Sequence, residues 1–304
     1  MHTTITIDAL KVLDAIDRKG SFAGAASELF RVPSAISYTI QKLEEDLNVS
    51  IFDRTGHKAV LTPAGRHLLN EGRALLNAAE NLAHSTQQIA QGWETRLRIG
   101  FNSLLPAECL MPAIRNFQNL SVPVDVQIIE EVFAGAWDAL QSRRVDLIVG
   151  ADLLSKPTGS FATRTLGQVP FVFAVAPNHP LAKLKGALSE SQIIQYPAAV
   201  AADTSRALSP GHAGIFSRQR TITVTNIDQK IAIQEAGLGV GWLPKPRIRQ
   251  QLANGTLIAK DVHEPRAPIS IHLARHRDDK GKALMWFWRE LSEDVQLKNW
   301  LEIE

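Results

Sequence analysis

The feature that most constrains this chain is the apolar spacing of residues 33–47. Its apolar members recur every three or four residues and share one stripe of an α-helix: Ile36, Ile40, Leu43 and Leu47. Its polar members fall on the other side: Ser34, Ser37, Tyr38, Gln41 and Lys42. Pro33 suits the first position of a helix, because its missing N–H has no intrahelical partner there. The spacing predicts a helix with one packed face and one free face.

A shorter helix pattern comes directly before this one. It starts at Ser21, a plausible N-cap, and carries Ala25 and Ala26, which are small enough to let two helices cross closely. Residues 30–32 form the predicted turn. Two short helices joined by a tight turn are typical of a helix-turn-helix, whose second helix lies in the major groove of DNA. An ordinary helical pair with a solvated polar face is the alternative.

The predicted DNA contacts come from both helices and from a short wing that follows them. Short hydroxyl and amide side chains at the start of a groove-facing helix favour contacts with base edges. The candidates are Ser21, Arg31, Ser34, Ala35, Ser37, Tyr38, Gln41, Lys42, Arg54, His57 and Lys58. Arg54 and the wing at residues 55–58 are expected to contact phosphate or the minor groove. The spacing does not indicate which bases are contacted.

The N-terminal residues resemble the LysR-type transcriptional regulators. The matching pattern is Gly20-Ser21-Phe22, Ala25-Ala26, Leu29, Ala35-Ile36-Ser37, Ile40, Leu43-Glu44, Leu47, Phe52, Arg54 and Leu61-Thr62-Pro63-Ala64-Gly65. Residues 145–150, 179–182 and 236–244 look like recurrent pieces of that family's effector domain, so the resemblance covers nearly the whole chain. The chain departs from the family at Val32, Pro33, Tyr38 and Asn48. These departures leave the fold intact and put the operator sequence in doubt.

Composition limits the number of domains and the kind of partner only broadly. A chain of 304 residues with 45% hydrophobic content suggests about two domains. The net charge of +2 does not indicate nucleic acid, and residues 1–62 hold seven basic and eight acidic residues. A basic surface must therefore come from placement. We expect a cytoplasmic protein without a membrane partner, because no signal-peptide pattern and no run of about 18 apolar residues occurs. Cys109 is the single cysteine; an inert buried thiol and a redox sensor both remain open.

A long helix is predicted from Pro63 to about residue 92. Apolar residues recur along it every seven positions: Leu68, Leu75, Leu82 and Ile89. Such a repeat indicates pairing with another helix. The alternative is a helix that lies on its own domain. A dimer is favoured, because two recognition helices would read two half-sites, and the resemblance implies that dimers pair into tetramers.

From residue 95 the pattern alternates between strands and helices. The expected strands are 97–101, 124–130, 145–150, 171–175, 198–202, 221–225, 240–243 and 269–273, and the expected helices are 106–120, 133–142, 228–236 and 280–296. Alternation of this kind predicts a parallel sheet with helices on both faces. We therefore expect an α+β multidomain chain: a winged helix-turn-helix (1–62), a linker helix (63–92) and an α/β effector domain (93–304).

The effector domain is expected to contain two Rossmann-like subdomains, one at about 93–164 and 266–304 and the other at about 165–265. The resemblance implies a likeness to periplasmic binding proteins, with the ligand in a cleft between the halves. Ligands bind beyond the carboxyl ends of strands, where helix N-termini attract anions. The candidates are Asn102, Ser103, Val132, Phe133, Phe173, Thr204, Asn226, Ile227 and Trp242. The resemblance points independently to Ser103, Thr204 and Asn226.

These residues predict the chemical class of the effector but not its identity. Helix N-termini favour a carboxylate, and Phe133, Phe173 and Trp242 favour an aromatic or partly apolar molecule. Helix capping by the polar residues and core packing of the aromatic ones remain the plain alternatives.

Signals for an enzyme are weak. The glycines at 237, 239 and 241 follow a helix and precede a strand, which reverses the order of a dinucleotide-binding motif. His272 and His276 have no third ligand nearby, so we expect no metal and no cofactor. The prediction is a ligand-responsive DNA-binding regulator, with RNA polymerase as a candidate further partner. A solute-binding module without DNA function and a small-molecule enzyme are the alternatives.

Overall fold

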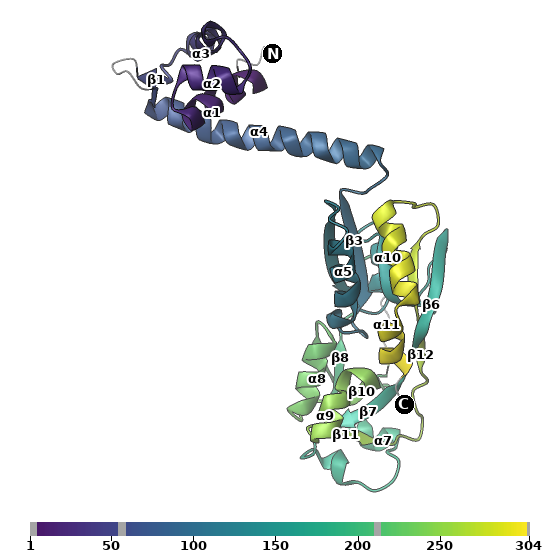
Figure 1. The fold of residues 1–304 in the computed structure, drawn as a ribbon. Coiled ribbons are helices and arrows are strands. Elements are labelled where there is room, and N and C mark those ends of the chain that lie inside the picture. Colours follow the sequence, from purple (N-terminus) through teal and green to yellow (C-terminus); the bar gives the residue numbers. More distant parts are fainter. Residues whose placement is uncertain (1–4, 54–58, 210–213, 303–304) are drawn as a thin grey trace. The chain divides into compact units, whose positions relative to one another are not determined.

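The computed structural model describes residues 5–53, 59–209 and 214–302. The chain forms two compact units, Met1–Gln91 and Gly92–Glu304, each with its own core (Figure 1). No helix in the described ranges is long and apolar enough to cross a membrane.

Three helices form the core of the first unit. They are α1 (Ile7–Lys19), α2 (Phe22–Glu28) and α3 (Pro33–Leu47). The hydroxyl of Ser21 accepts the Gly24 N–H at 3.0 Å, so the predicted N-cap is confirmed. The helix predicted over 33–47 is confirmed with Pro33 in its first turn. Its apolar stripe packs in the core, and Ile36, Ile40 and Leu43 are buried.

A two-stranded wing follows α3. Strands β1 (Phe52–Asp53) and β2 (Val60–Leu61) pair antiparallel. The Glu44 carboxylate on α3 accepts the N–H groups of Ile51 and Phe52, at 2.6 and 3.2 Å. This carboxylate fixes the start of the wing against the second helix of the motif. Residues 54–58 lie outside the described residues, so the DNA contacts predicted for Arg54, His57 and Lys58 remain predictions.

The long helix α4 (Pro63–Ala90) begins where it was predicted. Thr62 caps it by accepting the Gly65 N–H at 3.0 Å, and the Thr62 hydroxyl donates to the Ser50 carbonyl at 2.7 Å. Gly65 is required by the packing, because a Cβ there would lie 2.2 Å from the Ile51 carbonyl oxygen. The Thr-Pro-Ala-Gly sequence thus seats α4 against the wing.

The second unit contains a five-stranded sheet in the order β4-β3-β5-β12-β6. The strands are β3 (Arg96–Asn102), β4 (Asp125–Glu131), β5 (Leu147–Asp152), β6 (Phe161–Val169) and β12 (Ile269–His276). β3 is parallel to β4 and β5, whereas β12 is antiparallel to β5 and β6. The prediction of a parallel sheet is therefore wrong for one half. β6 was missed, because the predicted crossover near residue 165 falls inside it.

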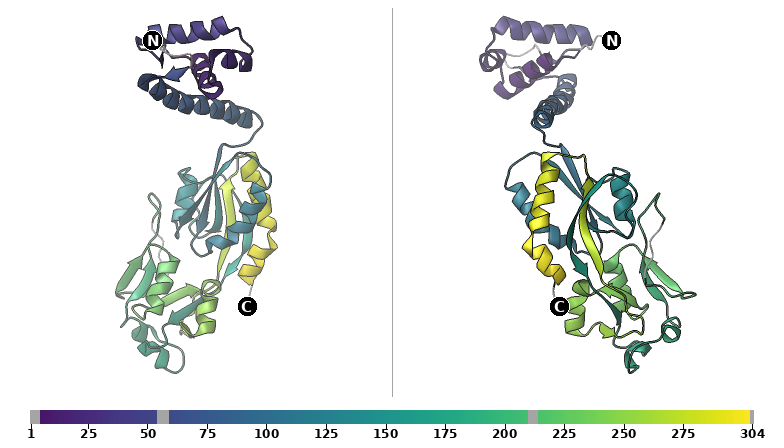
Figure 2. Two further views of the ribbon diagram at one scale, coloured as in Figure 1. Left: turned by 60° about the vertical axis from the view of Figure 1, so that its left-hand side comes forward. Right: turned by 90° about the vertical axis from the view of Figure 1, so that its right-hand side faces the viewer.

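Helices cover both faces of this sheet, as predicted. They are α5 (Met111–Gln118), α6 (Gly135–Gln141), α10 (Lys282–Glu293) and α11 (Val295–Glu302). Alternate residues of β5 face opposite sides: Val149 joins the core cluster of α5 and α10, and Ile148 joins that of α6. In Figure 2 the yellow helix α10 runs along one face of the sheet.

Two predicted helices are shorter than expected. The first turn of the helix predicted over 106–120 is a 3-10 turn (Ala107–Leu110), and the α-helix begins only at Met111. The final helix breaks at Asp294, whose backbone is extended and whose Oδ1 accepts the Leu297 N–H at 3.0 Å. The Asp294 side chain begins a new helix, which explains the break.

The rest of the second unit carries shorter elements. β7 (Phe171–Val175) lies between β10 (Gly241–Pro244) and β11 (Ile258–Lys260), antiparallel to both, and β8 (Ala198–Ala201) pairs in parallel with β9 (Thr221–Val224). The helices are α7 (Glu190–Ile193), α8 (Ile227–Glu235) and α9 (Arg249–Asn254), with 3-10 turns at Pro180–Lys183 and Lys245–Ile248. β11, α7 and α9 were not predicted from the sequence, and the predicted second parallel unit is corrected to these smaller sheets. These elements have three, four and six residues, which are too few to show a period.

Candidate functional site

The polar face of α3 is open on the first unit. Its exposed residues are Ser34, Ser37, Tyr38, Gln41 and Lys42, and Ala35 between them is half-buried. Gln41 donates from Nε2 to the Glu45 carboxylate at 2.9 Å, one turn along the helix. No element of the described first unit buries this face, so a duplex can approach it.

Two further predicted contacts already have partners. The Ser21 hydroxyl is engaged as the cap of α2. Arg31 donates from its two terminal nitrogens to the Asp8 carboxylate, at 2.9 and 2.6 Å. The hydrogen bond from Arg31 holds the pKa of Asp8 below its ordinary value. A phosphate that contacts Arg31 must therefore share the guanidinium with Asp8.

Two exposed apolar residues lie next to α3. Phe30 is 97% exposed, with a φ of +55°, and Val32 at the N-cap of α3 is 63% exposed. Both belong to the turn predicted at residues 30–32. Their exposure could have been predicted from the sequence, because each is a bulky apolar residue in a short turn, where few neighbours can bury it.

The seven-residue repeat of α4 changes role along the helix. Leu68 is half-buried against the core of the first unit. Leu75, Leu82 and Ile89 are 53%, 67% and 63% exposed. The repeat therefore begins in the unit's own core and continues as an exposed apolar stripe.

In the second unit, five of the nine predicted effector residues line one small cavity. They are Asn102, Ser103, Val132, Phe133 and Ile227. Arg266 and Asp152 also border it, and its volume is about 40 Å³. A space of this size holds a water molecule or two and no aromatic ring.

Thr204 lies beside this cavity in a strap that closes over the start of α6. The backbone N–H groups of Ala134 and Gly135 both donate to the Asp203 carboxylate at 3.1 Å. The Thr204 hydroxyl accepts the Val132 N–H at 3.0 Å and donates to Glu131. The helix N-terminus that was expected to attract an anionic ligand thus already binds the protein's own carboxylate.

The other predicted effector residues also have structural roles. Asn226 caps α8 by accepting the Gln229 N–H at 3.0 Å, and its amide donates to Glu130 at 3.4 Å. Phe173 and Trp242 are buried and meet edge to face with their ring centroids 5.6 Å apart. The structure therefore does not bring Phe173, Thr204, Asn226 or Trp242 to the wall of the small cavity.

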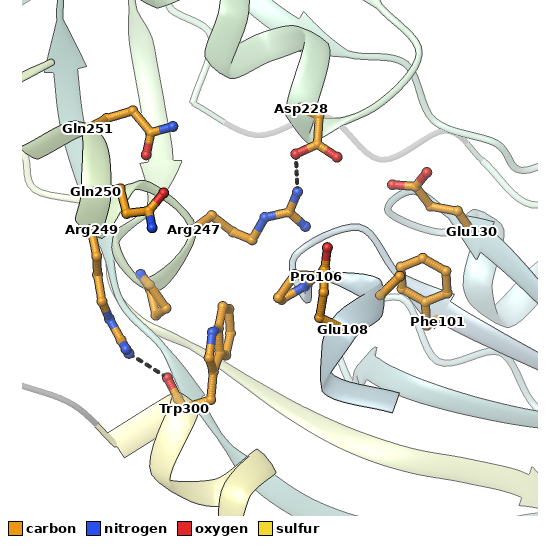
Figure 3. A pocket seen from close by; sticks show the side chains of 12 residues that line it. Phe101, Pro106, Glu108, Glu130, Asp228, Arg247, Arg249, Gln250, Gln251 and Trp300 are labelled. Carbon is orange, nitrogen blue, oxygen red and sulfur yellow. Dashed lines mark hydrogen bonds and ion pairs between the residues drawn. The ribbon is translucent and has the colours of Figure 1, made fainter. Parts of the chain in front are cut away.

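A larger cavity of about 620 Å³ lies among α8, α9, α11 and the ends of β3 and β4 (Figure 3). The Arg247 side chain is 7% exposed; it pairs with Asp228 and donates to the Ser103 and Leu105 carbonyls, both at 2.9 Å. Arg249 donates to the Trp300 carbonyl at 2.7 Å. This cavity was not predicted from the sequence, because its walls come from segments that only the fold brings together.

The candidate metal ligands are His272 and His276, and the single cysteine is Cys109. Across the described ranges, no group of three or more His, Cys, Asp or Glu side chains is placed to hold a metal ion. A ring nitrogen of His276 lies 2.8 Å from the Leu140 carbonyl oxygen, and His272 is buried. Burial raises the pKa of the half-buried Cys109 thiol to about 11, which keeps it protonated near neutral pH.

Comparison with known proteins bears on both units. The family model described as the bacterial regulatory helix-turn-helix protein, lysR family, matches residues 7–66, and the LysR substrate binding domain matches residues 90–296. The chain is 40% identical over 289 residues to the probable HTH-type transcriptional regulator YhaJ of Escherichia coli (strain K12), covering 94% of this chain and 96% of that protein. It is 34% identical to the HTH-type transcriptional regulator PunR of the same organism, covering 96% and 95%.

Among solved structures, a Corynebacterium glutamicum OxyR C206 mutant has the same fold. It matches with a TM-score of 0.64 at 19% identity and covers 98% of this chain and 97% of its own. The exposed face of α3, the long helix and the α/β unit agree with these matches. The chain belongs to the LysR family of DNA-binding transcriptional regulators, with an N-terminal helix-turn-helix and a C-terminal effector-binding domain.

Proposed function

We propose that this regulator reads its operator through the free face of α3 and changes its DNA binding when a small molecule enters the effector domain. The single observation that carries the first part is the exposure of Ser34, Ser37 and Gln41 on a helix whose opposite face is buried. N-terminal residues of a recognition helix are the ones that meet base edges. The wing at residues 54–58 is proposed to contact the backbone or the minor groove.

A mobility-shift assay with the chain's own upstream DNA tests this role. Ser37→Ala and Gln41→Ala are each expected to weaken specific binding by about 1–3 kcal/mol, since each removes a base contact. Ser217→Ala, an exposed serine in the second unit, is the matched control and should bind like the wild type. Unchanged operator discrimination in both α3 variants would remove them from the interface.

The regulator is proposed to act as a homodimer, or as a tetramer made of two dimers. The exposed stripe of Leu75, Leu82 and Ile89 supports this, because an apolar seven-residue repeat is buried by a second helix in a coiled coil. A dimer presents two recognition helices to two half-sites. RNA polymerase as a further partner and a cytoplasmic location are proposed from family membership alone, and no catalytic activity is proposed.

The effector is proposed to bind between two subdomains, at about 93–164 with 266–304 and at about 165–265. The cavity of about 40 Å³ is too small for an aromatic effector, so it must widen to admit one, and we propose that it does so when the strap at Asp203 and Thr204 moves away from Val132 and the start of α6. A ligand shifts such an equilibrium only through its differential affinity for the open and closed arrangements. A carboxylate or a partly apolar molecule is the proposed class.

A thermal-shift screen of small carboxylates and phenolic compounds identifies binders. With any binder in hand, Thr204→Ala is expected to blunt its effect on DNA binding and to leave DNA binding without ligand unchanged. A normal dose response in Thr204→Ala would take Thr204 out of the effector mechanism.

A further inference from the structure

The start of α3 departs from the capping pattern of the other helices in the first unit. Thr6, Ser21 and Thr62 begin α1, α2 and α4, and the side-chain oxygen of each accepts a backbone N–H of its own helix, at 3.1, 3.0 and 3.0 Å. Val32 begins α3, and its side chain makes no such hydrogen bond. Serine, threonine, aspartate and asparagine stabilise this position, whereas valine does not. The residue at the start of α3 therefore lowers the stability of the helix.

The end of α2 shows a second departure, two residues earlier. The Phe30 N–H donates to the Ser27 carbonyl at 3.4 Å, and the Arg31 N–H donates to the Ala26 carbonyl at 2.9 Å, which together form a Schellman motif. The residue at the centre of this motif has a positive φ and is usually glycine or asparagine. Asn48 has this conformation after α3, with a φ of +53°, whereas Phe30 adopts a φ of +55° after α2. A bulky aromatic residue is strained there, so Phe30 also lowers stability.

Neither side chain gains stability from packing within the unit. Phe30 is 97% exposed, and Val32 is 63% exposed. Their Cα atoms lie at most about 7 Å apart, because a single residue separates them. That residue, Arg31, bonds to Asp8 and so ties the turn to α1. The turn thus holds two apolar side chains in water, and residues that oppose the local structure in this way occur at functional sites.

The turn leads directly into the face of α3 that is proposed to contact DNA. Pro33 and Ser34 follow Val32, and Ser34 is exposed on the polar face. The N-terminal residues of a recognition helix contact base edges in the major groove. Because Val32 lies at the same end of the helix, a duplex that reaches Ser34 also reaches the turn.

The major groove offers an apolar side chain one kind of partner. The C5-methyl group of thymine is the apolar group among the base edges, which otherwise present hydrogen-bond donors and acceptors. A side chain without polar atoms cannot bond to those donors and acceptors, but packing against the methyl group removes both from water. DNA is favoured over a protein as the partner, because the two residues are continuous with the polar face of α3.

We infer that Phe30 and Val32 are specificity-determining residues that pack against the C5-methyl groups of thymines in the operator. The inference rests on the proposed function, because it adds two residues to the DNA-binding surface of α3. It explains why the chain has phenylalanine and valine where the local structure favours asparagine and serine. The two side chains add affinity only where the operator places a thymine against them.

Uracil substitution in the operator tests the inference. The full-length chain selects its operator from a library of random duplexes, and each thymine of the selected site is then replaced in turn by uracil, which lacks only the methyl group. At one or more positions the wild type is expected to bind about fourfold more weakly, which corresponds to the loss of one buried methyl group. Titrations followed by fluorescence anisotropy measure the affinities.

Three variants assign the uracil penalties to side chains. Val32→Ser is expected to bind the thymine and uracil duplexes equally at the position that Val32 contacts, and Phe30→Asn at the position that Phe30 contacts. Val295→Ser is the matched control, because Val295 lies in the second unit and is 65% exposed. This control is expected to retain every penalty of the wild type.

The two turn variants also allow a measurement without DNA. Serine caps a helix and asparagine suits a positive φ, so each variant is expected to melt at or above the temperature of the wild type. A lost uracil penalty then cannot result from a damaged fold. A lower melting temperature in either variant would overturn the inference for that residue, because the side chain would then stabilise the fold itself.

Other results would also overturn the inference. It fails if no uracil substitution weakens binding by the wild type, or if every penalty persists in both turn variants. If one variant alone loses a penalty, the inference holds for that residue and is overturned for the other. If both variants bind DNA as the wild type does but no longer regulate transcription, the turn contacts a protein partner instead.

Failure of the proposed function gives a different result. If Ser37→Ala and Gln41→Ala weaken operator binding and no uracil substitution does, the proposed role of the polar face stands and the inference falls. If uracil penalties depend on Phe30 or Val32 while Ser37→Ala and Gln41→Ala bind as the wild type does, the inference stands and the role of the polar face falls. If the library yields no enriched sequence, operator recognition itself fails.

Discussion

The two units of this regulator differ in which side chains lie in an unfavourable environment. In the first unit, apolar side chains are exposed: Phe30, Val32, Leu75 and Leu82 are all more than half exposed. In the second unit, polar atoms are buried and unpaired, and every such atom found in the described residues lies there, Gln234 among them. Exposed apolar side chains are common on protein surfaces, whereas a buried polar atom without a hydrogen-bonding partner costs free energy. The contrast shows that apolar surface is left exposed in the first unit, whereas unpaired polar atoms are left buried in the second.

The largest effect is expected from a substitution in the exposed apolar stripe of α4, which tests whether this stripe joins the subunits. Leu82→Asp should weaken self-association at least 100-fold, about 3 kcal/mol, since it places a charge in each half of an apolar seam. Light scattering across a dilution series measures this. Asn81→Asp adds the same charge next to the stripe and should leave the oligomer intact. A wild-type oligomer in Leu82→Asp would show that another surface holds the subunits together.

The next effect concerns how α4 is seated on the first unit. Gly65→Ala should cost about 2–3 kcal/mol, because the new Cβ would meet the rigid Ile51 carbonyl at 2.2 Å. Gly72→Ala is the matched comparison: its Cβ would meet only the tip of the Leu10 side chain, at 2.7 Å, and that side chain can rotate. Urea unfolding followed by circular dichroism measures both. Equal costs for the two variants would contradict this account of the Thr-Pro-Ala-Gly sequence.

The stability of each unit is also expected to rise with pH, but in a different pH range. Burial acts to raise the pKa of Asp14, but hydrogen bonds from Arg18 and Arg73 outweigh it, so the folded pKa lies below the ordinary value. Such a carboxylate stabilises the fold above the unfolded pKa of about 4 and loses that effect as pH falls through its folded value. Arg73→Met should therefore make the first unit less sensitive to acid.

In the second unit the sign is the same, but the pH range is higher. Lys230 has a folded pKa of about 7, below its ordinary 10.5, so the unfolded chain binds more protons between these values. Stability should therefore rise from pH 7 toward pH 10, and Lys230→Met should flatten that rise. All six tryptophans lie in the second unit, so their fluorescence follows that unit alone. A wild-type slope in Lys230→Met would assign the rise to other groups.

The smallest effect concerns the end of the recognition helix. Asn48 follows α3 with a φ of +53°, in the left-handed region that asparagine tolerates better than alanine. Asn48→Ala should cost about 0.5–1 kcal/mol, and Asn48→Gly should be neutral or slightly stabilising. Thermal unfolding of the two variants side by side measures the difference. A more stable Asn48→Ala variant would contradict this explanation of the helix end.

The sequence predicted the first unit more completely than the second. The apolar stripe of α3, the Ser21 cap and the start of α4 depend on residues close together in the chain, and local periodicity reveals such elements. β6 and β11 depend on pairing with strands far away, so their residues carry no strong local pattern. The strap at Asp203 and Thr204 and the larger cavity around Arg247 also arise only when distant segments meet.

The central claim is that the polar face of α3 lies in the major groove of the DNA, while its apolar face packs in the core of the first unit. Site-specific photocrosslinking tests it most directly: benzoylphenylalanine is placed at Gln41, or at Lys185 as a control, and irradiated with the chain's own upstream DNA. The account predicts an operator-dependent crosslink from position 41 and none from position 185. Operator DNA that is bound specifically, yet crosslinks from neither position, would contradict it.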